Sequence, residues 1–365
     1  MGNLKKLQSA VFSLIILAMF CASIIFSDAV SREISSGIHI CLYVIIPSLY
    51  GAMVCACMIT ESGLHHIIGK LLSPAAKYIF RLRPEIFAVF IISNISGYPV
   101  GAKLLSDLRK KGEITDREFD SYISFCYASG PAFVAGTAAA QIYRSFFAGM
   151  VIFSSIITAN NILVFISSFK RSRPCASHII TTHCDDHSSV VLSSVNNAAG
   201  GMFQMCIMII AFSMIRGILS ELGVIGFLSA LVSEISGMSH QDSAASFLSF
   251  IEISNVTRFT FMDYNNMPLI AALLSFGGLC VILQVFAIAN NRIAKLRFFL
   301  YRLAGSILTY FICRAACLIF ADRFVISTAS YKILSKSSSA LPSVILIIMS
   351  VLLISQKAID KTSSK

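Results

Sequence analysis

The sequence contains no tryptophan and few charged residues, which make up 13% of the chain. Soluble domains carry about 25% charged residues, so much of the usual charge is missing here. Hydrophobic residues account for 56% of the 365 positions. A water-facing fold cannot bury that much apolar surface, and the composition therefore predicts an integral membrane protein.

The sequence also lacks the signatures of several enzyme classes. It has no GxxxxGK[ST], GxSxG or HExxH motif, so ATP hydrolysis, serine hydrolysis and zinc proteolysis have no support. Its 11 cysteines include no CxxC pair, and most lie in apolar runs, where a thiol behaves as a small hydrophobe. We therefore expect no enzyme, no cofactor and no disulfide framework.

The positive charge of the chain follows its apolar runs. The net charge is +11, and lysine and arginine gather in the gaps between these runs. Membrane proteins place such residues on the cytoplasmic side. The charge therefore predicts topology rather than a nucleic-acid partner.

The first apolar run, residues 7–26, follows Lys5 and Lys6 and resembles a signal peptide. It is longer than the usual apolar region of such a peptide, and residues 28–33 contain no A-x-A cleavage site. We expect a retained first span with the N-terminus inside.

Hydropathy predicts an all-α polytopic protein with about eight transmembrane helices and two re-entrant segments. Two further amphipathic stretches, 64–80 and 223–232, are expected to lie on the membrane surface. The re-entrant segments are 86–105 and 245–261. The expected spans are 7–26, 39–59 bent at Pro47, 122–141, 146–169, 202–222, 268–289, 303–320 and a short last one at 341–354.

Helix-breaking residues interrupt the apolar runs in four places. The stretch SNISGYPVGAKLLSDLRKKGEIT, residues 93–115, follows a run too short to span and ends in a basic cluster. Further breaks occur at Ser129-Gly130-Pro131, at Ser254-Asn255 and at Gly277-Gly278. Unwound backbone is tolerated at membrane depth only where protein or a water-filled cavity satisfies its polar groups. We expect the breaks to converge on a shared wet pocket.

The chain matches itself when it is shifted by 160 residues. ITESGLHHIIGKLLS (59–73) aligns with LSELGVIGFLSALVS (219–233). When the shift is made one residue longer, Ile92-Ser93-Asn94 aligns with Ile253-Ser254-Asn255. Chance similarity between apolar helices is the alternative explanation. With the N-terminus inside, the two copies have opposite orientations, as in secondary transporters. The predicted parts are a first helix at 1–35, repeats at 36–170 and 190–291 around a cytoplasmic loop at 171–189, and C-terminal helices and tail at 292–365.

Residues at the breaks are the candidate site for a small polar solute, because helix ends and polar side chains there offer donors and acceptors. Close packing of Gly and Ser without a ligand is the alternative. The candidate substrate-binding residues are Asn94, Ser96, Gly97, Tyr98, Pro99, Gly101, Ser129, Gly130, Pro131, Glu252, Ser254, Asn255, Gly277 and Gly278.

A family resemblance rests on three of these stretches: 93–115, SFCYASGPAFVAG and ALLSFGGLCVILQV. Over residues 37–289 the chain resembles the YlbJ-type sporulation integral membrane proteins, within the wider group that carries nucleoside-recognition "Gate" domains. The resemblance implies an association with endospore formation and a similarity to parts of nucleoside and ferrous-iron transporters. The second copy, IEISNVTRFTF, lacks the Gly-Tyr-Pro of the first, which puts a symmetric site in doubt.

Three other features are weighed separately. Glu252, a carboxylate within an apolar run, is a candidate for coupling to protons or Na⁺. Arg314 is expected to reach an interface or pair with a carboxylate. The loop with Cys175, His178, His183, Cys184 and His187 holds metal-ligating residue types without a zinc spacing, so we expect a solvated loop and no metal.

The sequence thus predicts a multi-pass protein of the cell membrane that moves a small polar solute, nucleoside-like or ionic, by alternating access. The other hypothesis is a non-transporting scaffold or assembly factor for spore formation. The expected partners are membrane lipids, the solute and a second copy or sporulation membrane protein.

Overall fold

The computed structural model describes residues 2–169, 187–259, 264–289 and 293–320, and these residues form helices and connecting turns without a strand. Within these described residues, five helices are long and apolar enough to cross a membrane: Ser27–Glu61, Phe146–Ser168, Ser188–Glu221, Tyr264–Ala289 and Lys295–Ile319. The all-helical membrane fold is confirmed, whereas eight spans are not. The expected span at 122–141 is divided between shorter helices, and the one at 341–354 lies outside the described residues.

The first half of the chain begins with α1 (Gly2–Ile25), which covers the first apolar run, and a long continuous helix. This helix comprises α2 (Ser27–Ile40), the π-helical segment η1 (Cys41–Ile45) and α3 (Ile46–Glu61). The π-helical turn comes directly before Pro47, where the missing N–H was expected to bend the span. The helix starts earlier than the predicted 39–59. Hydropathy does not reveal α2 because α2 is too polar, although α2 packs against α10 (His187–Glu221).

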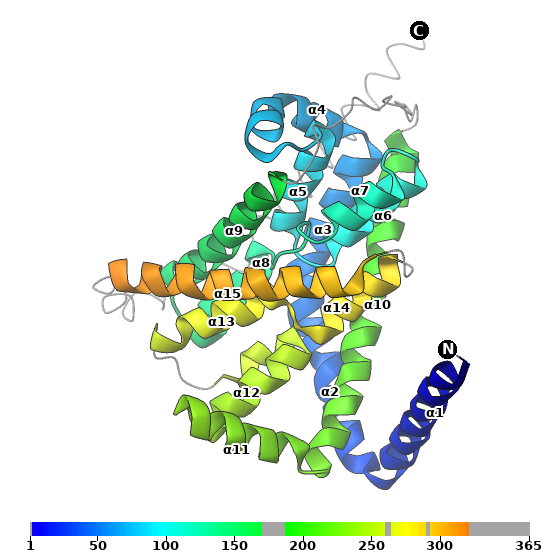
Figure 1. Ribbon diagram of the computed structural model, residues 1–365, viewed down its shortest axis with the longest axis vertical. Coiled ribbons are helices and arrows are strands. Elements are labelled where there is room, and N and C mark those ends of the chain that lie inside the picture. The colour runs from blue at the N-terminus through cyan, green and yellow to red at the C-terminus, as the bar shows by residue number, and fades with distance from the viewer. Residues whose placement is uncertain (1, 170–186, 260–263, 290–292, 321–365) are drawn as a thin grey trace. The chain divides into compact units, whose positions relative to one another are not determined.

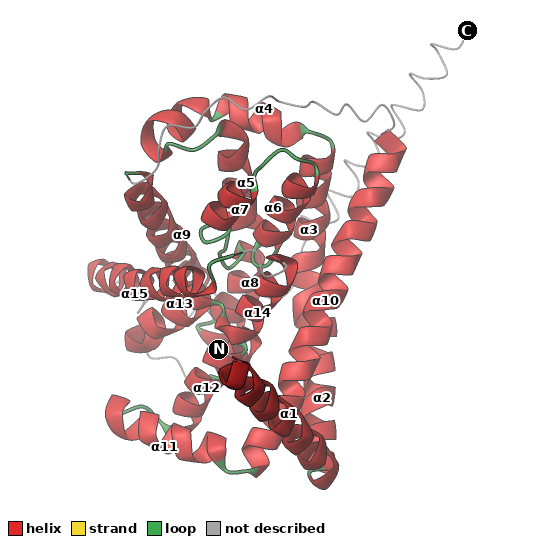
Figure 2. Ribbon diagram, turned by 45° about the vertical axis from the view of Figure 1, so that its right-hand side comes forward, coloured by secondary structure: helices red, strands yellow, loops and turns green. Residues whose placement is uncertain are grey.

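The two long helices stand side by side and the C-terminal helices cross them. Figures 1 and 2 both show α10 running along α2 and α3, with which it makes extensive contacts. In Figure 1, α13 (Met267–Phe276) and α15 (Lys295–Ile319) lie together crosswise to α10. The helices α13 and α15 therefore cannot run parallel to the membrane normal together with α10. The predicted spans at 268–289 and 303–320 had assumed that they do.

Two short helices have equivalent positions in the two halves. The helices α3 and α10 end at Glu61 and Glu221, and α4 (Leu64–Leu71) and α11 (Val224–Ser236) follow. Gly63 and Gly223 precede them with φ of 76° and 71°, in the left-handed region that favours glycine. Apolar side chains of both helices are exposed, as expected for helices on a membrane surface: Leu64, Ile67 and Leu71 in α4, and Phe227, Leu231 and Ile235 in α11.

The remaining elements are interrupted helices. The first half continues with the π-helical η2 (Ala75–Phe80), α5 (Pro84–Ser96), α6 (Val100–Lys110), α7 (Asp116–Tyr122), α8 (Pro131–Val134), the π-helical η3 (Ala135–Ile142) and α9 (Phe146–Ser168). The second half continues with α12 (His240–Ile251), the 3₁₀ segments η4 (Ile253–Arg258) and η5 (Tyr264–Asn266), and α14 (Gly278–Ala289). The basic turn before α7 contains a capping box, since Thr115 and Glu118 each accept a hydrogen bond from the other's backbone N–H.

A glycine allows α6 to pack against the chain that follows α7. A Cβ atom at Gly101 would lie 2.6 Å from the Ser93 Cβ and would also collide with the Cys126 carbonyl. A side chain here requires a shift of backbone, whereas nothing lies within 4 Å of a Cβ at Gly136 in η3.

We predict that Gly101→Ala lowers the free energy of unfolding by about 1–3 kcal/mol, the usual cost of overpacking. Gly136→Ala, the matched control, should leave it nearly unchanged. Thermal unfolding in detergent, followed by far-ultraviolet circular dichroism, measures both. Equal stability of the two variants would contradict this packing.

Candidate functional site

The four interruptions of the helices meet in one place. We call them the first break (97–99, between α5 and α6), the second (123–130, before α8), the third (at Glu252, between α12 and η4) and the fourth (at Gly277, between α13 and α14). A Cβ at Gly97 would lie 2.9 Å from the Gly130 N, and one at Gly278 would lie 3.0 Å from the Ile253 N. The first break therefore touches the second, and the third touches the fourth.

Side chains of the first half bind the end of α13 in the second half. The Ser129 Oγ lies 2.9 Å from both the Leu274 carbonyl and the Tyr98 Oη, and that phenol lies 3.3 Å from the same carbonyl. The Tyr127 hydroxyl donates to the Phe276 carbonyl at 2.9 Å. The last carbonyls of a helix have no partner within it, and these hydroxyls satisfy two of them.

Two polar residues that the sequence analysis missed satisfy the second break. The Asn160 amide, from α9, donates to the Phe125 carbonyl and to the Asn94 Oδ1, each at 2.9 Å. The buried Arg302, from α15, donates to the Tyr127 carbonyl at 2.8 Å, and its guanidinium lies 4.9 Å from the centroid of the Tyr127 ring. The sequence shows Asn160 as a polar residue within an apolar run, whereas Arg302 stands just before the predicted span at 303–320 and no local pattern marks it as buried.

The third break is held by a polar network. Glu252, 3% exposed, accepts a hydrogen bond from the Ser254 N at 2.9 Å, and the Asn255 amide donates to the Glu252 carbonyl at 2.9 Å. Arg216 of α10 donates to the Asn255 Oδ1 at 2.5 Å and to Glu33 of α2 at 2.6 Å. Glu252 is thus buried as the sequence suggests, but it is linked to Arg216 through Asn255.

The interior of this junction is packed rather than wet. Ser129 and Ser254 have no exposed surface, and Ser96 and Asn94 are buried as well. The polar groups of Asn94, Ser129 and Ser254 bind other protein groups. Among the described residues the breaks converge as expected, and the second break supplies hydrogen-bond partners to the end of α13 at the fourth.

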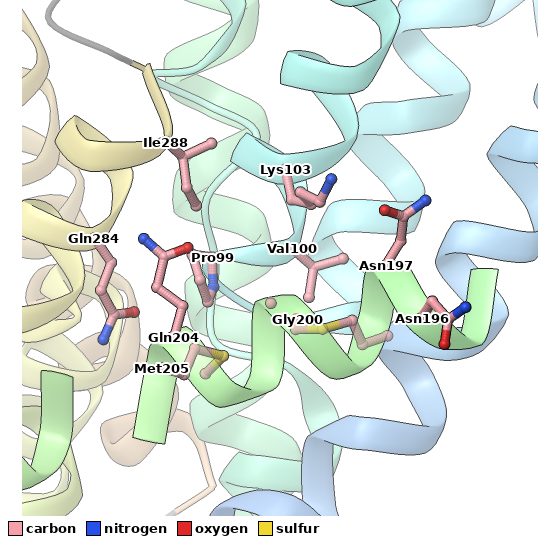
Figure 3. Close-up of a pocket in the computed structure, with 12 residues that line it drawn as sticks. Pro99, Val100, Lys103, Asn196, Asn197, Gly200, Gln204, Met205, Gln284 and Ile288 are labelled. Atoms are coloured by element: carbon pink, nitrogen blue, oxygen red, sulfur yellow. The ribbon is translucent and has the colours of Figure 1, made fainter. Parts of the chain in front are cut away.

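A pocket of about 200 Å³ adjoins the first break. Pro99 and Val100 form one wall, and Figure 3 shows Asn197 and Gln204 extending from α10 toward Lys103 and Pro99. Pro99 is the candidate residue from the sequence analysis that lines it. The full lining is Met53, Pro99, Val100, Lys103, Asn196, Asn197, Gly200, Gly201, Gln204, Met205, Gln284 and Ile288.

Amide side chains dominate the polar lining of the pocket. Asn196, Gly200 and Gln204 recur at four-residue spacing on one face of α10. The predicted span began at Met202 and therefore did not include Asn196 and Gly200. Gln284 is buried, and its Oε1 has no hydrogen-bond partner among the described residues. The Lys103 Nζ lies 2.8 Å from both carboxylate oxygens of Asp107, so its charge is balanced locally.

Comparison with known proteins supports the resemblance. The chain is similar to the sporulation integral membrane protein YlbJ of Bacillus subtilis, with 26% identity over 158 residues. The match covers 43% of this chain and 39% of that protein, so the chain spans about two fifths of the relative's length. No family model matches the chain. Together with the five candidate spans among the described residues, this similarity supports a multi-pass membrane protein.

We predict that Ser129→Ala lowers the free energy of unfolding by about 1–2 kcal/mol, because it removes a buried hydrogen bond between the two halves. Ser154→Ala is the matched control, since Ser154 donates only within its own helix, to the Val151 carbonyl. Thermal unfolding in detergent compares the two. A Ser129→Ala protein as stable as the control would show that this contact does not hold the halves together.

Proposed function

We propose that the protein is a permease that moves a small polar solute through the pocket beside the joined breaks. The observation that carries the proposal is the position of this amide-lined pocket directly against the first break, at Pro99 and Val100. Solute sites in secondary transporters lie where broken helices from two repeats meet. The similarity to a sporulation membrane protein suggests that its setting is the membrane of a spore-forming cell.

The arrangement of the two halves supports an inverted repeat. In Figures 1 and 2 the equivalent helices α4 and α11 lie at opposite ends of the described structure, and each exposes apolar side chains. Two copies with opposite orientations place equivalent interfacial helices on opposite membrane surfaces. With the N-terminus inside, α4 belongs to the cytoplasmic surface.

The lining of the pocket favours an uncharged solute. Four amides line it, at Asn196, Asn197, Gln204 and Gln284, and Lys103 is neutralised by Asp107. Amides both donate and accept, and they pair with the amide-like edges of nucleobases. The volume lies below the roughly 300–1,000 Å³ of pockets for drug-sized ligands. A nucleoside or a smaller polar molecule fits these conditions better than an ion.

We predict that Gln284→Leu lowers the initial rate of solute uptake about tenfold, since loss of one hydrogen bond to the solute costs about 1–1.5 kcal/mol. Ile288→Leu, an apolar change in the same pocket, should stay within about twofold of the unsubstituted protein. Uptake of radiolabelled nucleosides and small amino acids into proteoliposomes is the measurement. No uptake above empty vesicles for any solute would overturn the proposal.

The dense packing of the breaks supports a second hypothesis, a membrane scaffold for spore formation. Ser129, Ser254 and Asn255 are buried and bind other protein groups, which suits a rigid structural core. The two hypotheses differ in what Gln284→Leu does in a Bacillus subtilis strain that lacks YlbJ. If the unsubstituted chain restores heat-resistant spores and Gln284→Leu restores them equally, the scaffold is favoured. If only the unsubstituted chain does, the permease is favoured.

A further inference from the structure

A cluster of two histidines and a glutamate lies apart from the pocket, where α4 meets the turn between α6 and α7. His65 and His66 belong to α4, and Glu113 belongs to the turn. One nitrogen of each imidazole and one oxygen of the carboxylate lie within 4.8 Å of one another. Neither the joined breaks nor the proposed solute site uses these residues.

The distances in the cluster are longer than those of strong hydrogen bonds, and they are close to the spacing between ligand atoms around one metal ion. The Nε2 atoms of His65 and His66 lie 3.4 Å and 3.7 Å from the same atom, the Glu113 Oε2. Charge-assisted hydrogen bonds between such groups are about 2.7–2.9 Å long. Zinc binds nitrogen and oxygen at about 2.0–2.2 Å, so the edges of a tetrahedral site measure roughly 3.3–3.5 Å.

The three side chains of the cluster face one another. The side chain of His65 is 1% exposed, and those of His66 and Glu113 are 20% and 12% exposed, which leaves one side of the cluster open to an ion. The Nδ1 atoms of both histidines are buried without a hydrogen-bond partner in the described structure.

The nearest arginine is not a counter-ion of the Glu113 carboxylate. Arg83 donates to the Glu113 backbone carbonyl at 2.9 Å. Its guanidinium also faces Glu85 at 3.7 Å and Glu118 at 3.5 Å. The Glu113 carboxylate therefore faces the two imidazoles rather than Arg83, and Lys111 adds an electrostatic interaction with it.

We propose that His65, His66 and Glu113 bind a divalent transition metal of the zinc class, with a fourth position open to water. Two imidazoles and one carboxylate suit Zn²⁺, whereas Ca²⁺ and Mg²⁺ prefer an all-oxygen set. The ion ties the surface helix α4 to the turn that joins α6 to α7.

The test measures Zn²⁺ binding to the full chain, purified in detergent and stripped with a chelator, by competition with a chromophoric chelator. We expect one tight equivalent and a higher melting temperature with Zn²⁺, because a ligand of the folded state stabilises it. Glu113→Gln and His66→Gln should weaken binding by at least about 100-fold, the upper end of the loss when a partner of a metal ligand is removed. His240→Gln, at an exposed histidine that begins α12, should bind like the unsubstituted chain.

A second arm separates the cluster from the Cys- and His-containing segment that precedes α10. A variant with Cys175, His178, His183 and Cys184 all replaced by Ser should keep the tight equivalent. Co²⁺ bound at the cluster should show tetrahedral visible absorption without a thiolate charge-transfer band. Absence of tight Zn²⁺ binding, its loss in the four-Ser variant, or its persistence in both Glu113→Gln and His66→Gln would overturn the proposal.

Discussion

The structure depends on satisfying backbone carbonyls where helices stop inside an apolar protein. A broken helix leaves its last carbonyls without partners, and a bilayer offers no water to replace them. Here α13 ends at Phe276. The Leu274 carbonyl accepts a hydrogen bond from the Ser129 hydroxyl, and the Phe276 carbonyl accepts one from the Tyr127 hydroxyl. The second break in turn relies on Asn160 and Arg302. Each half of the chain therefore supplies hydrogen-bond partners to backbone carbonyls of the other half.

This exchange explains why the junction is dry. The backbones approach so closely at Gly97 and Gly130, and at Gly278 and Ile253, that no side chain fits between them. Asn94, Ser129 and Ser254 at the breaks are buried and bind other protein groups. The adjoining pocket takes its polarity from α10 and α14 instead, with only the outer edge of the first break in its wall.

The breaks could be predicted from the sequence because they reflect local conformational demands. Gly97-Tyr98-Pro99 and Gly277-Gly278 disfavour a regular helix, and the structure interrupts its helices there, whereas the pair Gly200-Gly201 continues within α10. The capping box at Thr115 is local for the same reason. The length of α2 could not be predicted from hydropathy, because its burial comes from contact with α10.

Residues whose roles depend on a distant partner were missed. Gln204 and Gln284 lie far apart in the sequence and line the same pocket. His65 and His66 are visible as a pair, but Glu113 gives them a common partner only after α4 packs against the turn that follows α6. Arg302 stands at the edge of the predicted span at 303–320, and the structure buries it with its guanidinium 4.9 Å from the centroid of the Tyr127 ring.

The length of α10 determines how deep the pocket lies. At about 1.5 Å per residue, the segment from Asn197 to Glu221 measures roughly 36 Å, more than the hydrocarbon layer of about 30 Å. If the Glu221 end sits at the surface where α11 lies, Asn197 reaches the opposite surface. There it binds Glu61, directly before α4. The pocket therefore lies beside the end of α3 that leads into α4, with the first break in its wall.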